Sequence, residues 1–356
     1  MRSAHRSSRY AAGALLVGMA VAATACSSSS TSSAAPAATT GAGSASTAPS
    51  AAAPSAASGS GGASGTVTNV TLGYVPYSDD ASLFYAQDSG IFKKHGLNVT
   101  FVAQASPVAV EASMASGTEQ FGFITTPVLI NLNSKGVNVK CVSSVDGNQP
   151  SNPADDSTVL AAAKGSGIKS VKDLAGKNVA EVQLTSLNSL AVEILAKQAG
   201  IDPTSIHQIA IPFAQMPAAL AQGRVQAAVI VEPFTDTAVS EGATVLTHPN
   251  VDLFPNGTVT CLDAMGSYLS ANPTVASEFR AAMNESIAYT QTHQAVVKQS
   301  LVKGLSLTSA VAAKQKLATN FNSTFNVASI TTIENYMKQF GVITSEPSAS
   351  SMIWNP

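Results

Sequence analysis

A strand, a polar turn and a helix follow one another in residues 70–90, VTLGYVPYSDDASLFYAQDSG. Apolar residues alternate with small or polar ones from Val70 to Tyr74, which is the period of a strand with one buried face. Three residues that favour helix N-caps occupy positions 78–80, and Gly90 stands after the segment 81–89 as a helix stop. The stretch predicts the first β-strand and α-helix of an α/β domain.

Strand-like and helix-like segments keep alternating as far as residue 231. Proline and glycine mark several helix ends, as at Pro107 and Gly117. This regular alternation predicts parallel sheets flanked by helices, with right-handed crossovers. After Pro255 the order changes, because residues 258–269 look strand-like and helices then dominate to about residue 340. The further expected strands cover residues 97–102, 121–124, 139–145, 159–163, 179–182, 206–211 and 227–231.

The first 25 residues have the organisation of a signal peptide. A basic start with arginines at positions 2, 6 and 9 precedes an apolar run over residues 11–25, and small residues at 23–25 then lead into Cys26. This arrangement indicates a lipobox, with lipid such as palmitate attached to Cys26 after cleavage. An ordinary secretory signal, cut near Ala25 and leaving Cys26 as a free thiol, is the alternative.

The segment after Cys26 is expected to be a flexible tether. Residues 27–65 consist only of Ser, Ala, Thr, Pro and Gly, a composition that cannot bury a core. No later apolar stretch approaches the roughly 20 residues that a membrane-spanning helix needs. The chain has 19 Lys and Arg against 21 Asp and Glu, with no basic stripe, so nucleic acid is not an expected partner.

Several short blocks, taken in their order and spacing, resemble the nitrate, sulfonate, bicarbonate and thiamine-precursor (SsuA/THI5-like) family of ABC-transporter substrate-binding proteins. The likeness covers roughly residues 70–245 well and the C-terminal helices loosely. A single block is a weak signal, but the set together is specific. The blocks are residues 70–75, 83–87, 90–97, 121–127, 168–177, 218–223 and 231–234.

The resemblance implies a two-lobed, type II periplasmic-binding-protein-like fold with the solute in a cleft between the lobes. Residues 66–157 and 248–356 are expected to form lobe I, and residues 158–247 lobe II. Such a protein is no enzyme and needs no cofactor. It captures a small molecule and delivers it to the permease subunits of an ABC importer. Together with Cys26, this predicts a monomer that is anchored by lipid to the outer face of the cytoplasmic membrane.

Two other functions stay open at this point. A solute sensor uses the same closed lobes but presents them to a membrane receptor instead of a permease. The resembling family also includes an enzyme that makes the thiamine pyrimidine, and that activity depends on a cysteine-rich motif with an active-site lysine and histidine. This chain has 3 cysteines and no cluster of them, so the enzyme is the less favoured alternative.

Candidate solute-binding residues lie in the turns that follow strands, because open parallel sheets bind ligands at the carboxyl ends of their strands. Each turn leads to a helix N-terminus with free N–H groups. The turns at 125–126 and 185–189 and Glu232 also match positions that the resembling family uses. The full set is Tyr77, Ser78, Asp79, Asp80, Ser106, Thr125, Thr126, Thr185, Ser186, Asn188, Ser189 and Glu232.

These candidates include carboxylates but no lysine or arginine. We therefore expect a neutral or cationic small organic solute rather than nitrate. Helix capping alone is the competing role for Ser78, Asp80, Ser106 and Ser186. A helix-dipole or hinge role competes at Glu232, and packing at the cleft rim competes at Tyr77.

Cys141 and Cys261 remain once Cys26 is assigned to lipid, and an exported protein favours a disulfide between them. Two separately buried thiols are the alternative, since sequence does not give the distance between them. The 5 histidines are scattered and none has metal-ligand spacing with another His or Cys, so no metal site is expected.

Overall fold

The computed structural model describes residues 67–147, 154, 156–318 and 320–356. The predicted signal peptide, the predicted lipidation site Cys26 and the tether expected over residues 27–65 lie outside these residues. Among the helices that are described, none combines the length and the apolar character needed to cross a bilayer.

The first sheet has the strand order β2-β1-β3-β11-β4. Its strands are β1 (Thr68–Tyr74), β2 (Leu97–Ala103), β3 (Phe121–Thr125), β4 (Val139–Ser144) and β11 (Thr260–Met265). Four helices belong to the same part of the chain, namely α1 (Ala81–Asp88), α2 (Ile91–Lys94), α3 (Pro107–Ser116) and α4 (Thr126–Ser134). A short 3-10 turn, η1 (Ser78–Asp80), links β1 to α1, as the polar turn in the sequence predicted.

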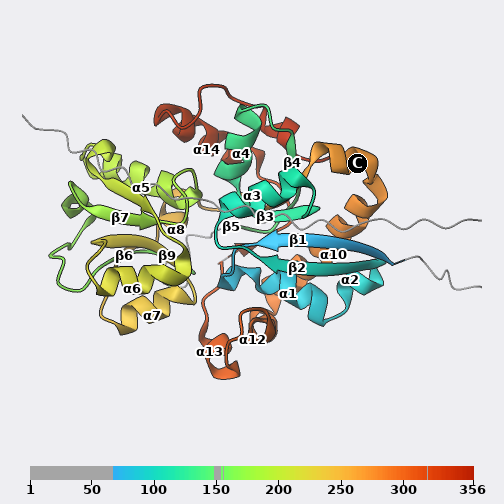
Figure 1. The fold of residues 1–356 in the computed structure, drawn as a ribbon, viewed down its shortest axis with the longest axis horizontal. Coiled ribbons are helices and arrows are strands. Elements are labelled where there is room, and N and C mark those ends of the chain that lie inside the picture. Colours follow the sequence, from blue (N-terminus) through green and yellow to red (C-terminus); the bar gives the residue numbers. More distant parts are fainter. Residues whose placement is uncertain (1–66, 148–153, 155, 319) are drawn as a thin grey trace, which may run out of the picture. The chain divides into compact units, whose positions relative to one another are not determined.

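The second sheet has the strand order β10-β6-β9-β7-β8. Its strands are β6 (Thr158–Ala162), β7 (Asn178–Glu181), β8 (His207–Ala210), β9 (Ala227–Val231) and β10 (Thr244–Thr247). The helices here are α5 (Leu187–Gln198), α6 (Met216–Ala221), α7 (Phe234–Ser240) and α8 (Pro249–Leu253), with 3-10 turns η3 (Val171–Leu174), η4 (Pro203–Ser205) and η5 (Phe213–Gln215). In Figure 1 these yellow-green elements surround one sheet, and the blue to green elements surround the other.

The C-terminal part is helical and returns to the first sheet. The long helix α10 (Pro273–Thr292) packs on α1, α2 and β4, and α14 (Val327–Gln339) packs on α4. The short strand β12 (Asn320–Phe321) pairs with β5 (Asp146–Gly147). The remaining elements are α9 (Gly266–Ala271), α11 (Gln294–Val297), η6 (Lys298–Ser300), α12 (Leu301–Gly304), α13 (Ser309–Lys314) and η7 (Ala349–Met352).

The predicted α/β class is confirmed, but the prediction of parallel sheets is wrong, since both sheets are mixed. β11 runs antiparallel to β3 and β4, and β6 runs antiparallel to β9 and β10. β6 is the first strand of the second sheet, and β11 is the first strand after the chain returns to the first sheet. Neither is reached through a βα crossover within its own sheet, so the crossover rule does not set its direction.

Local patterns placed most strands to within a residue or two, but the segment after Pro255 was predicted wrongly. Residues 258–269 contain the strand β11 and then the helix α9, because a short apolar run fits either period. The elements α7, β10 and α8 were not predicted from the sequence. α8 begins at residue 249, within the range expected for lobe I, yet it packs on α5 and β6 of the second sheet.

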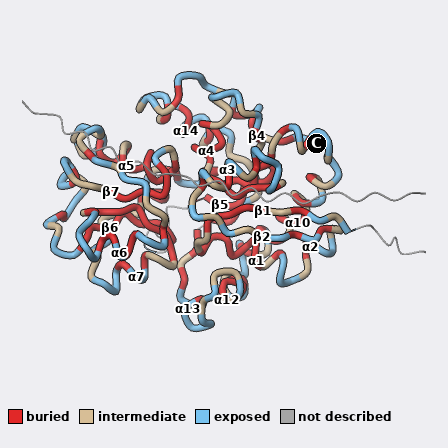
Figure 2. Tube along the Cα trace, in the orientation of Figure 1, coloured by how far each residue is buried: buried red, intermediate tan, exposed pale blue. Residues whose placement is uncertain are grey.

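Buried apolar side chains continue from one lobe to the other. One cluster includes Ile124 and Val128 from the first part of the chain and Val182 and Leu187 from the second. Separate clusters fill the space behind each sheet, one around Phe121 and the other around buried side chains of β6, β7 and β9. Figure 2 shows the buried segments as red tube in both sheets and in the helices that lie on them. The two lobes are thus packed together in this structure.

Candidate functional site

A cavity of about 60 Å³ lies between the two sheets. A single water needs roughly 10–15 Å³, so the space fits a guest of a few non-hydrogen atoms. The walls come from both lobes and from the two segments where the chain passes between them. The lining residues are Val75, Tyr77, Asp79, Pro107, Phe123, Ile124, Thr125, Asp146, Asp156, Ser157, Thr158, Val182, Ser186, Leu187, Asn188, Phe213, Val231, Asn250, Val259, Thr260 and Ala318.

Three aromatic rings form one part of the wall. Tyr77, in the loop after β1, stacks on Phe123 of β3 with ring centroids 5.7 Å apart and planes within 5°. Phe213 of the second lobe lies 6.4 Å from Tyr77 at a tilt of 57°. Because a ring face carries partial negative charge, such a set offers apolar contact and attracts cations.

The carboxylate of Asp79 connects three distant segments of the chain. Its Oδ2 accepts a 2.7 Å hydrogen bond from the Ser157 hydroxyl, and its Oδ1 accepts a 2.5 Å bond from the Ala318 backbone N–H. Ser157 lies where the chain passes between the lobes, and Ala318 lies just before β12. Asp79 is therefore held in place at the cavity wall by a hydrogen bond on each oxygen.

Asp146 and Asp156 line the same cavity and are almost completely buried, with exposed fractions of 2% and 1%. Asp146 Oδ1 accepts a 2.6 Å hydrogen bond from the Thr260 hydroxyl, whereas its Oδ2 has no hydrogen-bond partner among the described residues. Asp146 stands at the carboxyl end of β4, in the short strand β5. The lining of the cavity thus includes a buried carboxylate, one oxygen of which receives no hydrogen bond from a described residue.

Burial and mutual repulsion make these acids harder to ionise. Burial raises the pKa of Asp79 to about 6. Burial, followed by the charge of Asp79, raises the pKa of Asp156 to about 8. The pKa of Asp146 is raised well above its usual range by burial and then by Asp79. A positive charge placed among them would reverse the effect of the repulsion.

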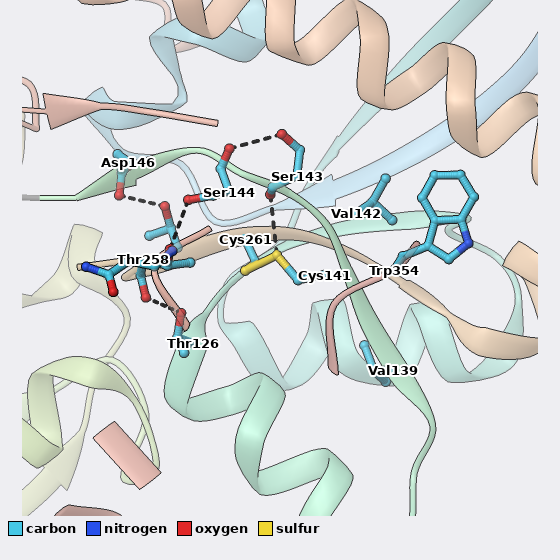
Figure 3. Close-up of a disulfide and its surroundings, with 12 residues drawn as sticks. Thr126, Val139, Cys141, Val142, Ser143, Ser144, Asp146, Thr258, Cys261 and Trp354 are labelled. Carbon is cyan, nitrogen blue, oxygen red and sulfur yellow. Dashed lines mark hydrogen bonds between the residues drawn. A yellow bond between two sulfur atoms is a disulfide. The ribbon is translucent and has the colours of Figure 1, made fainter. Parts of the chain in front are cut away.

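A disulfide braces the strands that carry part of this wall. Cys141 of β4 and Cys261 of β11 are bonded, with Cα atoms 5.6 Å apart and a sequence separation of 120. Figure 3 shows the bond beneath the strand that leads through Ser143 and Ser144 to Asp146. Thr260, the hydrogen-bond donor to Asp146, directly precedes Cys261. The pairing that the sequence left open is therefore present next to the cavity.

Five of the residues predicted from the sequence line the cavity, namely Tyr77, Asp79, Thr125, Ser186 and Asn188. Ser186 also caps α5, since its hydroxyl accepts a 3.3 Å hydrogen bond from the Ser189 N–H. Ser106 and Thr185 line a separate, more open groove between the lobes. The remaining five are absent from the cavity lining.

Each of these five has its own partner nearby. The Ser78 N–H donates to the Glu232 carbonyl at 2.9 Å, so the two residues join the lobes. Asp80 Oδ2 accepts from the Tyr77 N–H, and the Thr126 hydroxyl donates to the Thr258 carbonyl. The Ser189 hydroxyl donates to the Leu184 carbonyl, and Glu232 Oε2 accepts from the Asp236 N–H. In this structure, these five residues therefore make hydrogen bonds within turns, between neighbouring segments or between the lobes.

Several lining residues were missed by the sequence analysis. Asp146 directly follows the expected strand 139–145, so the rule that selected Asp79 would have selected it too. Asp156 and Ser157 belong to the passage between lobes, for which no local pattern exists. Phe123 and Phe213 read as ordinary core residues, and only the tertiary structure places them beside Tyr77.

Polar contacts hold the lobes together around the cavity. The Gln183 side-chain amide donates to Glu111 Oε1 at 2.9 Å. Gln315 accepts from the Ser78 hydroxyl at 2.9 Å and donates to Asp236 at 3.3 Å. These few hydrogen bonds, unlike a continuous sheet, can be broken and remade when two lobes separate and close.

The fold of two sheets with their helices is shared with solved structures of solute-binding proteins. A ligand-binding component of an ABC-type import system from Staphylococcus aureus, with zinc bound, has a TM-score of 0.68 at 18% identity, covering 80% of this chain and 96% of that chain. The periplasmic aliphatic sulphonate-binding protein SsuA from Escherichia coli has a TM-score of 0.64 at 21% identity, with coverages of 81% and 92%. The periplasmic nitrate-binding protein NrtA from Synechocystis has a TM-score of 0.66 at 16% identity, with coverages of 80% and 85%. At these identities the likeness establishes the fold.

One curated protein is similar in sequence to part of the chain. The 4-amino-5-hydroxymethyl-2-methylpyrimidine phosphate synthase of Legionella pneumophila is 28% identical over 129 residues, which is 36% of this chain and 38% of the synthase. The chain thus matches well under half of the synthase's length. The NMT1/THI5-like family model matches residues 78–296, from the first turn at the cavity into the C-terminal helices. The chain therefore belongs to the NMT1/THI5-like family.

Proposed function

We propose that this protein is an extracytoplasmic solute-binding lipoprotein, which captures a small organic molecule between its lobes and delivers it to the permease of an ABC importer. The observation that carries the proposal is the cavity, whose walls come from both lobes and from the passages between them. A site built in this way exists only when the lobes are together. Release then follows from their separation.

The size and chemistry of the cavity agree with transport of a small solute. It is mostly apolar, with a few buried polar groups that orient a guest, as small-molecule sites usually are. The three structural relatives named above are binding proteins by their titles. Their shared fold supports the role proposed for this chain.

The proposed cellular location is based on the first residues of the chain. Lipid on Cys26 would hold the domain at the outer face of the cytoplasmic membrane, and residues 27–65 would give it the freedom to meet a permease. One copy of the domain contains both walls of the cavity, which supports a monomer as the binding unit.

The match to a pyrimidine phosphate synthase favours a second candidate, an enzyme of that kind. The resemblance drawn from sequence assigns such an activity to a cysteine-rich motif, a lysine and a histidine. The described residues that line the cavity contain none of these three types. The available groups are carboxylates, hydroxyls, an amide pair and aromatic rings, a set suited to binding, so we favour the binding protein.

Native mass spectrometry of the purified chain tests the proposed function. We expect a non-covalent small molecule to co-purify, and a strain that lacks the protein should take up that molecule more slowly than its parent. A strain lacking the protein that retains full uptake of the molecule would contradict the transport role. Loss of a signalling response to the molecule, with uptake unchanged, would point to the sensor instead.

A further inference from the structure

One carboxylate oxygen of Asp146 receives no hydrogen bond from a described residue. This side chain is 2% exposed and lines the cavity, and the oxygen concerned is Oδ2. A buried acceptor without a donor costs free energy, so a guest that supplies an N–H or O–H group to this carboxylate would bind more favourably. The inference drawn from this atom rests on the proposed solute-binding function and names the class of solute.

The charged groups around this atom indicate whether the guest carries a positive or a negative charge. Asp79, Asp146 and Asp156 line the cavity, and no Lys, Arg or His is among its described lining residues. The start of α5 faces the same space through Ser186 and Asn188 and carries about half a positive charge as a helix dipole. The charge of one ionised carboxylate is larger than that partial charge, so the cavity favours a cation. The start of α5 can still bind an acceptor atom of the guest.

The spacing of the acids argues for an organic cation rather than a metal ion. Within the described part of the chain, one set of three His, Cys, Asp or Glu ligand atoms lies within 4.8 Å, and it comprises Cys141, Cys261 and Asp263. Two of its members are joined in the disulfide. The three cavity carboxylates form no such tight set, and a larger cation bridges them better.

The aromatic rings favour a cation that has an apolar body. Tyr77 and Phe123 stack face to face, and Phe213 closes the wall from the other lobe. Val182, Leu187 and other aliphatic side chains complete the lining. Such walls favour aliphatic or aromatic carbon, and ring faces attract an ammonium group as well.

We propose that the cavity binds a small organic cation, a protonated amine on a short apolar body. Its ammonium group donates to Asp146 Oδ2 and lies among Asp79 and Asp156, and its carbon atoms contact Tyr77, Phe123 and Phe213. Closure of the lobes around it brings the carboxylates of lobe I and the aromatic ring of Phe213 to the same guest.

Isothermal titration of the full chain with n-butylamine and n-butanol, in amine-free buffer at pH 7.5, tests this assignment. The two probes have similar size and differ in charge. We expect the amine to bind at least about tenfold more tightly, which corresponds to one charge-assisted hydrogen bond. Asp146→Asn should remove most of that preference, whereas Asp202→Asn, an exposed cap in the second lobe, should leave it unchanged.

Parallel titrations with nitrate, ethanesulfonate, Ca²⁺ and Zn²⁺ decide between classes of guest. Binding of an anion or a metal ion without binding of the amine overturns the assignment, and so does equal binding of the amine and the alcohol. If none of the probes binds, the assignment fails as well. Asp156→Asn provides a second variant if Asp146→Asn does not fold. The transport role is judged separately, by co-purified solute and uptake, so either proposal can fail without the other.

Discussion

Individual carboxylates dominate the chemistry of the cleft. Asp79 has a donor on each oxygen, Asp146 has a donor on only one, and Asp156 has a pKa raised to about 8. A cavity that gathers such groups without a basic residue is unfavourable when empty at neutral pH, because the acids must stay protonated or repel one another. Their protonation then links stability to pH.

The solute-free protein should become less stable as the pH rises from 5 to 8. The pKa of Asp156 is higher in the folded than in the unfolded chain, so the folded state holds its proton longer and loses stability as pH rises toward about 8. Burial also raises the pKa of Asp79 and Asp146, which adds to the loss of stability as the pH rises. Burial lowers the pKa of His248, which has the opposite effect on stability.

Comparing Asp156→Asn with the parent isolates the contribution of one acid, because His248 is present in both proteins. We compare the free energy of unfolding of the variant with that of the parent at each pH. The difference in favour of the variant should be larger at pH 8 than at pH 5 by more than about 1 kcal/mol. Urea unfolding at both pH values measures the difference, and Asp202→Asn serves as the surface control. Equal shifts in Asp156→Asn and the parent would show that this acid is ionised without cost in the folded state.

At the scale of secondary structure, the strands β4, β5 and β11 position the polar side chains of the site. β4 leads to Asp146 in β5, β11 begins with Thr260, and the disulfide joins β4 to β11. Gly147 allows β5 to lie close to the neighbouring loop, because a Cβ atom there would stand 2.2 Å from the Gly257 carbonyl oxygen. The position of the unpartnered acceptor thus depends on this short strand and its support.

Replacing both bonded cysteines, Cys141→Ala with Cys261→Ala, should lower the free energy of unfolding by about 2–5 kcal/mol. The bond closes a loop of 120 residues, which restricts the unfolded chain. Denaturant unfolding measures the loss, and the parent protein treated with reductant should approach the variant. A variant as stable as the parent in oxidising buffer would show that packing alone holds these strands.

At the scale of the whole molecule, the proposed function requires that one cavity be formed by two sheets and that the domain stay at a membrane. The first condition is visible in the contacts between lobes, including Gln183 with Glu111 and Ser78 with Glu232. The second depends on Cys26 and the tether, which lie outside the described residues.

A Cys26→Ala variant should be released from the membrane while binding its solute as the parent does. The substitution removes the proposed site of lipid attachment, and the cavity lies in a separate part of the chain. Fractionation of cells and titration of the released protein measure the two properties. Cys141→Ala is the matched cysteine control and should stay anchored. A Cys26→Ala protein that remains wholly membrane-bound would contradict the lipid anchor.

The sequence by itself determined the α/β class, the family likeness, most strand positions and the turn that carries Tyr77 and Asp79. These features depend on side-chain period, on capping residues and on glycine or proline at element ends, all of which act within a few residues. The same local reasoning extends to Asp146, since it ends a predicted strand.

Only the tertiary structure decided the mixed direction of the sheets and the full composition of the cavity. β6 and β11 take their direction from passages between lobes, and Asp156, Ser157 and Phe213 reach the cavity only when the lobes pack. Contacts between residues far apart in sequence depend on the closure of long loops and on burial that no local pattern encodes. The candidate turns already contained carboxylates and no lysine or arginine, but the meeting of Asp79, Asp146 and Asp156 in one cavity depends on the tertiary structure.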